Sequence, residues 1–250
     1  MVDKERQQQI LDYIRMSGRA DVNSLARIFF VSAASVRRDL TELQNLGLVR
    51  RTHGGVLYNV STGERSISVR QTENIAGKEA AVAVALDRLP DFESVFFDNS
   101  STCYLLAQKL DLGKKTVVTN GLRLAAELAR RGAKVIMLGG EVTDSADQVS
   151  GSITTGAIGR YRFDAAFVSC AAVDGSNAYE RSFDTAVLKR TAVKRAASKC
   201  LIFDAAKLER NAPYSATELA EFDLIATDAP DARLTALRDG GCIVYNKRSE

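Results

Sequence analysis

The apolar residues near the start of the chain recur at helical spacing and predict three short helices. The first covers residues 6–16 and ends at the polar segment 17–19. The second begins after Asp21, whose carboxylate suits an N-cap, and the third begins after Ser32, beyond a break at residues 30–32. The apolar face of the third helix is formed by Val36, Leu40 and Leu43.

The opposite face of the third helix is polar and is cationic near its start. Two helices joined by a tight turn, the second with arginines and hydroxyls at its N-terminal end, are typical of a motif that reads bases in the DNA major groove. Residues 48–58 then place apolar positions on both sides of a cationic turn, which predicts a hairpin wing. The residues expected to contact DNA are Ser32, Ser35, Arg37, Arg38, Thr41, Arg50, Arg51 and His53.

Each of these signals has a plainer interpretation, because charged helix faces are usually solvated and paired glycines are usually turns. DNA binding is favoured because the two helices, the cationic face and the wing occur together, in the expected order. The run Ser35-Val36-Arg37-Arg38-Asp39-Leu40, with Leu43, Gly47 and Arg51-Thr52-His53-Gly54-Gly55, resembles the DNA-binding segment of the DeoR family of bacterial transcriptional regulators. In that family Asp39 is expected to position the neighbouring arginines, since a carboxylate would repel phosphate.

Composition narrows the choice of class. The chain has 250 residues, of which 46% are hydrophobic and 26% charged, as in a soluble protein with a small and a larger domain. The excess positive charge lies in residues 1–58, which hold 9 Lys and Arg against 6 Asp and Glu, whereas residues 59–250 hold 25 of each. The four widely spaced cysteines predict buried free thiols, and no signal peptide or membrane span is apparent, so a cytoplasmic protein without metal or cofactor is expected.

The domains predicted are a winged helix-turn-helix at 1–58, a linker at 59–74 and an effector-binding, oligomerising domain at 75–250. In the last, short apolar runs alternate with helical stretches, which implies an α/β fold with a mostly parallel sheet. Strands are expected at 94–97, 116–119, 134–138, 165–170, 200–203, 224–227 and 242–245. Helices are expected at 75–89, 102–110, 122–131, 152–161, 183–197 and 229–239.

Small polar loops follow several of these strands, and ligands bind at such carboxyl ends in parallel sheets. One loop opens directly into a helix, whose N-terminus suits an anion. Serines, asparagines and glycines are also ordinary turn residues, so each loop alone says little, but together they predict a phosphorylated small molecule with charge added by Lys189 or Lys207. The predicted effector residues are Asp98, Asn99, Ser100, Ser101, Thr102, Thr119, Asn120, Gly139, Gly140, Asp174 and Lys189.

The same region is similar to the effector domain of the DeoR family. The similarity covers 98–102, Thr119-Asn120, Gly139-Gly140, Gly151, the stretch from Phe163 to Asp174, and Leu188-Lys189-Arg190. It implies a domain related to sugar-phosphate isomerases such as ribose 5-phosphate isomerase, with phosphorylated sugars or polyols as ligands.

The two halves together predict a repressor of a carbohydrate-utilisation operon that binds operator DNA and responds to a phosphorylated sugar or polyol, as a homo-oligomer (dimer or tetramer) with no membrane partner. The alternative is a sugar-phosphate isomerase or hydrolase with an appended DNA module, in which Asp174, Asp184 and Lys189 would supply the acid-base chemistry. A DNA-compacting architectural protein is disfavoured, because a net charge of +3 is too small for binding dominated by phosphates.

Overall fold

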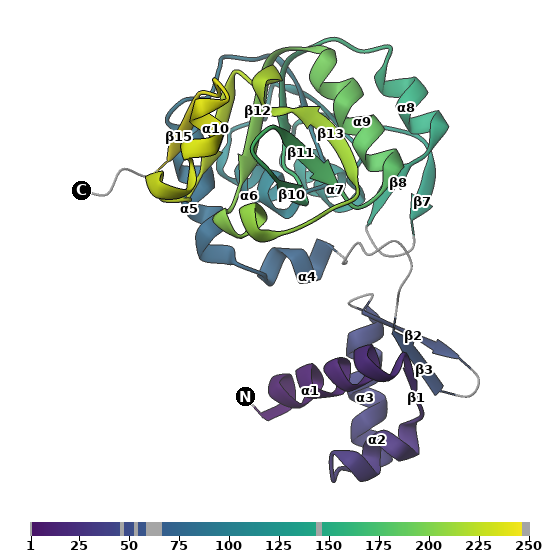
Figure 1. The fold of residues 1–250 in the computed structure, drawn as a ribbon. Coiled ribbons are helices and arrows are strands. Elements are labelled where there is room, and N and C mark those ends of the chain that lie inside the picture. Colours follow the sequence, from purple (N-terminus) through teal and green to yellow (C-terminus); the bar gives the residue numbers. More distant parts are fainter. Residues whose placement is uncertain (1, 46–47, 53–54, 59–66, 144–146, 247–250) are drawn as a thin grey trace. The chain divides into compact units, whose positions relative to one another are not determined.

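The computed structural model describes residues 2–45, 48–52, 55–58, 67–143 and 147–246, and the chain forms two compact units that divide between Val69 and Arg70 (Figure 1). Three residues named in the sequence analysis, Gly47, His53 and Gly54, lie outside the described residues. Each unit is built around its own hydrophobic core, the smaller one from the first three helices.

The N-terminal unit contains three helices and a three-stranded antiparallel sheet of order β1-β3-β2. The helices are α1 (Val2–Ser17), α2 (Val22–Ile28) and α3 (Ala33–Asn45), and the strands are β1 (Arg19–Ala20), β2 (Val49–Thr52) and β3 (Gly55–Tyr58). The predicted apolar faces meet in one core of Ile10, Ile14, Leu25, Val36, Leu40, Leu43, Val49 and Val56. The predicted helices and wing are therefore confirmed, although α1 starts four residues earlier than expected.

A further helix, α4 (Ile67–Thr72), occupies part of the segment for which the sequence predicted only a linker. Its six residues are too few to show helical periodicity, and Ile67 is its buried apolar side chain. The division between the two compact units falls inside this helix.

The larger unit is organised on a seven-stranded sheet of order β15-β14-β12-β9-β4-β5-β6, in which every neighbouring pair is parallel. The strands are β4 (Ser94–Phe97), β5 (Thr116–Thr119), β6 (Lys134–Met137), β9 (Phe163–Val168), β12 (Ala196–Phe203), β14 (Leu224–Thr227) and β15 (Val244–Asn246). All seven predicted strands are present, and β12 begins four residues before its prediction because Ala196 to Lys199 continue the pairing with β9.

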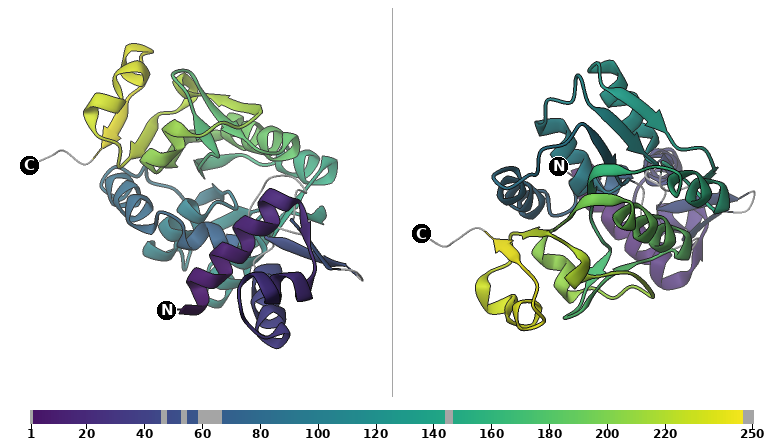
Figure 2. Two further views of the ribbon diagram at one scale, coloured as in Figure 1. Left: turned by 60° about the horizontal axis from the view of Figure 1, so that its bottom comes forward. Right: turned by 90° about the horizontal axis from the view of Figure 1, so that it is seen from above.

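Helices cover both faces of this sheet, as the views in Figures 1 and 2 show. One face packs against α5 (Ile75–Leu86), α6 (Ser101–Lys109) and α7 (Leu122–Arg130), and the other against α8 (Ser152–Ile158), α9 (Phe183–Lys194) and α10 (Thr235–Asp239). The side chains of β4 alternate between these two faces. Val95 and Phe97 belong to the core on the side of α5, α6 and α7, and Phe96 belongs to the core on the side of α8, α9 and α10. The helix predicted at 229–239 is divided into a 3-10 turn (Asp231–Arg233) and α10.

Two small antiparallel sheets were not predicted. Strands β7 (Glu141–Thr143) and β8 (Gln148–Ser150) form one, and β10 (Ala172–Val173), β11 (Asn177–Glu180) and β13 (Tyr214–Glu218) form the other. Their strands have only two to five residues, which is too short for an alternating pattern to stand out from loops. They bring Gln148 and Glu180 into the larger unit as buried polar residues.

The cysteines are free thiols, of which Cys103, Cys170 and Cys200 are buried as predicted, whereas Cys242 is half-buried. Within the described residues, no helix combines the length and apolar character that crossing a bilayer requires. The same part of the chain contains no cluster of His, Cys, Asp and Glu suited to a metal ion.

Candidate nucleic-acid interface and ligand site

The turn between α2 and α3 is fixed by two capping residues. Asp21 accepts hydrogen bonds from the backbone N–H groups of Asn23 and Ser24 at 3.0 and 2.9 Å. Ser32 caps α3 by accepting from the N–H of Ser35 at 3.1 Å, and its hydroxyl also lies 3.0 Å from the hydroxyl of Ser35. Both caps agree with the sequence analysis, and they orient α3 so that its apolar face is buried.

The predicted DNA-contacting arginines all lie at the surface of the N-terminal unit. Arg37 and Arg38 are exposed on α3, and Arg50 and Arg51 are exposed on β2. None of these four guanidinium groups pairs with another residue in the described parts of the chain. Thr41 is also exposed, and its hydroxyl donates to the carbonyl of Arg37 at 2.8 Å. The unit therefore presents four unpaired cations on its third helix and its wing.

Asp39 has a different role from the one that the family resemblance implied. It is 3% exposed, and its carboxylate accepts from Arg6 Nε at 2.8 Å, Arg6 Nη2 at 3.1 Å and Gln7 Nε2 at 3.3 Å. These partners lie on α1, so Asp39 fastens α3 to α1, and its described contacts do not include Arg37 or Arg38. The sequence offered no sign of the pairing, because 33 residues separate Arg6 from Asp39.

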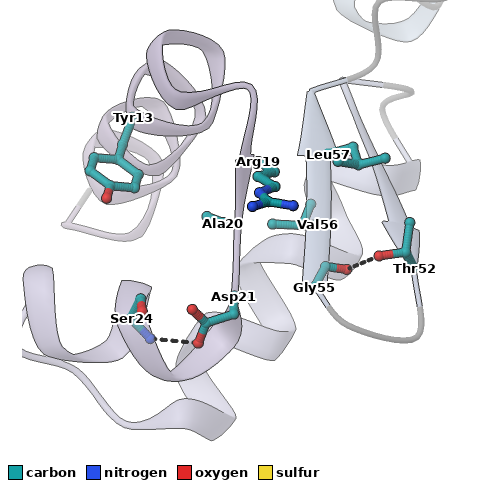
Figure 3. A pocket seen from close by; sticks show the side chains of 9 residues that line it. All are labelled: Tyr13, Arg19, Ala20, Asp21, Ser24, Thr52, Gly55, Val56 and Leu57. Atoms are coloured by element: carbon teal, nitrogen blue, oxygen red, sulfur yellow. Dashed lines mark hydrogen bonds between the residues drawn. The ribbon is translucent and has the colours of Figure 1, made fainter.

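A cavity of about 460 Å³ lies in the N-terminal unit between the end of α1, the start of α2 and the wing (Figure 3). Its lining is Tyr13, Arg19, Ala20, Asp21, Ser24, Thr52, Gly55, Val56 and Leu57. Gly55 permits the close approach of β3 to β1, since a Cβ there would lie 2.4 Å from the carbonyl oxygen of Ala20. Of the predicted DNA-contacting residues that the structure describes, none lines this cavity.

In the larger unit, the predicted effector loops gather at the carboxyl edge of the sheet. The strand order reverses between β4 and β9, which makes the ends of these two strands the expected ligand crevice. The segment after β4 is buried throughout: Asp98, Asn99 and Ser100 form the loop, and Ser101 and Thr102 begin α6. Ser100 caps α6 by accepting from the N–H of Cys103 at 3.1 Å, so the first-turn amides of α6 face this edge.

Asp98 connects the two strands at the reversal point. Its carboxylate accepts from the N–H of Ser100 and the N–H of Ser169, both at 3.0 Å, and lies 2.7 Å from Nζ of Lys189. Burial alone would raise the pKa of Asp98, but the Lys189 ammonium outweighs it and holds the pKa below its ordinary value. These contacts hold Asp98 between the two loops, and its predicted contact with the effector stays a prediction.

Lys189 reaches this carboxylate from α9 and is 7% exposed. Its ammonium contacts Asp98 at 2.7 Å, Glu180 at 2.5 Å and the carbonyl of Ser169 at 2.8 Å. Burial disfavours the charged form, yet the two carboxylates raise the pKa of Lys189 above its ordinary value. Three donors with three partners leave Lys189 saturated. Its predicted contact with an effector would require one of these partners to be displaced.

Carboxamides cluster beside the same crevice, after β4 and β5. Asn99 and Asn120 both donate to Oε1 of Gln148, at 3.5 and 3.3 Å, and Asn120 also donates to the carbonyl of Val149 at 3.3 Å. Nδ2 of Asn120 is thereby oriented, and its Oδ1 is a buried acceptor without a described partner. Thr119 supports the loop by accepting from the N–H of Gly121 at 3.1 Å. Gln148 was missed because it lies on the unpredicted β8.

Three predicted residues do not join this cluster. Asp174 is exposed in the β10–β11 turn, where its carboxylate accepts from the N–H groups of Ser176 and Asn177 and from the hydroxyl of Tyr179. Gly139 and Gly140 are exposed, and a Cβ on Gly140 would lie 1.9 Å from Oγ1 of Thr154. The close packing of residue 140 against α8 therefore explains why this position is a glycine.

The acid-base set of the enzyme alternative is likewise dispersed. Asp184 is exposed in the first turn of α9, Asp174 is held in its own hairpin, and Lys189 is saturated between Asp98 and Glu180. The described contacts bring no two of Asp174, Asp184 and Lys189 together.

Two further buried charged residues are Asp204, which directly follows β12, and Lys78, which lies on α5. Asp204, 1% exposed, accepts from Nδ2 of Asn74 at 2.7 Å. Lys78, 3% exposed, donates to the carbonyls of Arg70 and Glu73, and burial lowers its pKa to about 8.

Lys207 belongs to the loop that follows β12. It is half-buried, and burial lowers the pKa of its ammonium, which no described residue pairs by hydrogen bond or ion pair. Cys170, Asp204 and Glu180 are close enough to influence it. Lys207 is therefore a cation at this edge whose ammonium has no described partner, in contrast to Lys189.

Comparison with known proteins places these features in a family. Residues 6–62 match a family model described as the DeoR-like helix-turn-helix domain, and residues 73–229 match the DeoR C terminal sensor domain. The chain is 32% identical over 231 residues to the HTH-type transcriptional regulator GlpR of Haloferax volcanii, covering 91% of each.

Two further relatives and one solved structure complete the comparison. The chain is 28% identical to the lactose phosphotransferase system repressor of Streptococcus mutans, covering 92% of this chain and 94% of the other, and 28% identical to the L-fucose operon activator of Haemophilus influenzae, covering 89% and 91%. Ribose 5-phosphate isomerase A from Methanocaldococcus jannaschii is similar with a TM-score of 0.40 and 12% identity, covering 54% of this chain and 55% of that one.

Proposed function

The chain belongs to the DeoR family of transcriptional regulators, and we propose that it represses a carbohydrate-utilisation operon and is released from its operator by a phosphorylated sugar or polyol. The observation that carries the proposal is the contrast between four exposed arginines on α3 and the wing, which pair with none of the described residues, and a buried polar crevice in the larger unit. Such a combination is explained by regulation rather than by turnover.

The DNA-binding step follows from the placement of the cations. Arg37 and Arg38 lie on the exposed face of α3, where a guanidinium can donate two hydrogen bonds to a guanine edge in the major groove. Arg50 and Arg51 lie on the wing, where they neutralise phosphates independently of sequence. Asp39 supports this surface indirectly by holding α3 against α1 through Arg6.

The proposed effector site combines the first turn of α6, the carboxamides and Lys207. The N–H groups of Ser101 and Thr102 would hold a phosphate at the helix N-terminus, and the ammonium of Lys207 would supply the opposing charge. Oδ1 of Asn120 is a buried acceptor without a described partner, which suits a hydroxyl group of a sugar or polyol. Asp98 and Lys189 then act as supports that fix the loops after β4 and β9.

A route from this crevice to the DNA-binding unit is supported by the contacts of Asn74 and Lys78. Asn74 adopts a left-handed conformation, φ +46° and ψ +45°, and uses its carboxamide to contact Asp204 instead of capping α5. Lys78 holds the carbonyls of Arg70 and Glu73 at the end of α4. Because Asp204 and Lys207 share one loop and α4 spans the division between the two units, ligand binding at Lys207 would bias the position of α4.

We also propose that the protein acts as a homo-oligomer assembled through the larger unit. A single helix-turn-helix reads few base pairs, and a two-fold assembly spaces two such helices by one helical turn of DNA or a multiple of it. Light scattering of the full chain, with and without DNA, tests this step. A monomer mass at micromolar concentration under both conditions would refute it.

The function as a whole is tested with DNA selected from a random-sequence pool by the full chain. Titration of that duplex should give a specific affinity well above the affinity for random DNA. A panel of sugar and polyol phosphates is then screened by thermal shift, since a ligand that binds the folded state raises its melting temperature. A member that stabilises the protein should also weaken DNA binding. Stabilisation without any change in DNA affinity would contradict release by the effector.

A further inference from the structure

Phe30 is the most exposed large apolar side chain among the described residues, at 94%, and it lies in the turn that leads into α3. Its neighbour Phe29 is partly buried and packs edge-on against Tyr13 with ring centroids 6.3 Å apart. The core of the N-terminal unit therefore takes the first of the two phenylalanines and leaves the second in solvent. Exposure alone is common for a single apolar residue, so it requires a second observation.

The second observation is the backbone of Phe30, which has a φ of +52°. The N–H of Val31 donates to the carbonyl of Ala26 at 3.1 Å, closing α2 with the six-residue bond of a Schellman motif. Phe30 occupies the left-handed position of this motif, which glycine or asparagine ordinarily fills. A bulky side chain there is an outlier, because its Cβ crowds the following carbonyl.

Strain of this kind persists where function requires the side chain that causes it. Two residues after Phe30, Ser32 caps the helix that carries Arg37 and Arg38, so the exposed ring lies at the N-terminal end of the proposed reading helix. DNA offers apolar surface there in thymine methyl groups and deoxyribose rings, and phenylalanine is among the side chains that contact the thymine methyl.

We propose that Phe30 is a DNA contact: its ring packs against a thymine methyl or a deoxyribose at the edge of the major groove, and the left-handed turn is retained to project it. This inference rests on the proposed DNA binding. It distinguishes Phe30 from the cations of α3 and the wing, because an apolar contact releases no counterions and leaves the salt dependence of binding unchanged.

The test uses Phe30→Asn in the full chain, because asparagine tolerates the left-handed conformation without the flexibility of glycine. Relief of the strain should slow amide hydrogen exchange in α2 and α3 by about fivefold, whereas loss of the ring should weaken binding to the selected duplex by about tenfold. Phe30→Tyr keeps the ring and the strain, so it should match the wild type in both measurements within about threefold. Met16→Gln, at a position 90% exposed on α1, is the matched control and should change neither.

The proposal predicts that Phe30→Asn increases protection from hydrogen exchange and at the same time lowers DNA affinity. Phe30→Asn that gains protection and keeps its DNA affinity would overturn it, and so would a variant that loses protection, since the ring would then be supporting the fold. A duplex with uracil in place of thymine identifies the contacted group: wild-type affinity falls if the ring meets the methyl and is unchanged if it meets the sugar. Failure of the wild type to select any duplex would refute DNA binding itself, together with this inference.

Discussion

The two units of the chain use charge in opposite ways. In the N-terminal unit, Arg37, Arg38, Arg50 and Arg51 are exposed and pair with none of the described residues, whereas in the larger unit Lys189 is buried and contacts three acceptors. An unpaired surface cation contributes little to folding and is free for an external partner. A saturated buried cation contributes to the arrangement of loops and has no donor left for a ligand.

Substitutions of the two kinds of cation should therefore affect different properties of the protein. Removal of an arginine from α3 or the wing should change binding without changing stability, whereas removal of the buried lysine should change stability first. Lys207 departs from this pattern, because it is half-buried in the larger unit and has no described partner. Its ammonium is therefore a candidate for contact with a ligand.

The largest effect is expected for Lys189→Met, which leaves the carboxylates of Asp98 and Glu180 buried without their shared cation. The free energy of unfolding of the larger unit should fall by about 3–5 kcal/mol in urea titrations followed by circular dichroism. Lys115→Met is the control, because Lys115 forms an exposed ion pair with Glu93 at 2.6 Å that is worth about 0–1 kcal/mol. Equal stability of the two variants would break the comparison between buried and exposed charge.

Substitutions at Ser101 come next. Ser101→Ala should weaken binding of the phosphorylated ligand by about 1.5–3 kcal/mol if the hydroxyl contacts the phosphate, and Ser101→Asp should abolish it by placing a carboxylate in the anion site. Isothermal titration measures both. Ser182→Ala removes the N-cap of α9 instead and should lower stability without affecting the ligand. Unchanged affinity in Ser101→Asp would move the anion site away from α6.

The arginines of the N-terminal unit should separate by role. Arg38→Ala should cost about 1–3 kcal/mol on the selected duplex and much less on random DNA, because it removes a base contact. Arg51→Ala should weaken both duplexes alike and reduce the slope of affinity against salt by about one. Fluorescence anisotropy at several salt concentrations measures both variants. Equal losses for Arg38→Ala on both duplexes would reduce Arg38 to a phosphate contact.

The smallest effect on any single equilibrium is expected for Asn74→Gly, which keeps the left-handed backbone and removes the carboxamide that contacts Asp204. Ligand and DNA affinities should each remain within about threefold of the wild type. The factor by which the ligand weakens DNA binding, typically about 5–150, should fall toward one. Asn211→Gly, at an exposed loop position, should keep the full factor. A full factor in Asn74→Gly would exclude this route.

The sequence predicted what depends on local patterns and residue type. The capping roles of Asp21 and Ser32, the apolar face of α3 and all seven sheet strands are confirmed, because each follows from spacing over a few residues. The short strands β8 and β11 were missed, since three or four residues are too few to show an alternating pattern. Gln148 and Glu180 lie on these two strands, so their burial beside the predicted site was missed as well.

The candidate sites were likewise predicted where they depend on local sequence and missed where they depend on distant residues. Sequence placed the polar loops at one edge of the sheet, because parallel strands bring their carboxyl ends together. It did not predict which charges pair, since Asp98 and Lys189 are 91 residues apart in sequence and Arg6 and Asp39 are 33 apart. The sequence therefore did not reveal that Asp39 pairs with Arg6, or that Lys189 contacts Asp98 and Glu180; the effector contact of Lys189 stays a prediction.

The strand order has a consequence for how the chain is made. Strand β4 lies between β5 and β9, and β9 begins 66 residues after β4 ends. A ribosome adding about 5–20 residues per second needs roughly 3–13 s for that interval, during which one side of β4 has no neighbour. Its exposed sequence, Val95-Phe96-Phe97, is apolar and without charge, so it is open to pairing with another chain. The nascent protein is thus vulnerable to aggregation between the emergence of β4 and that of β9.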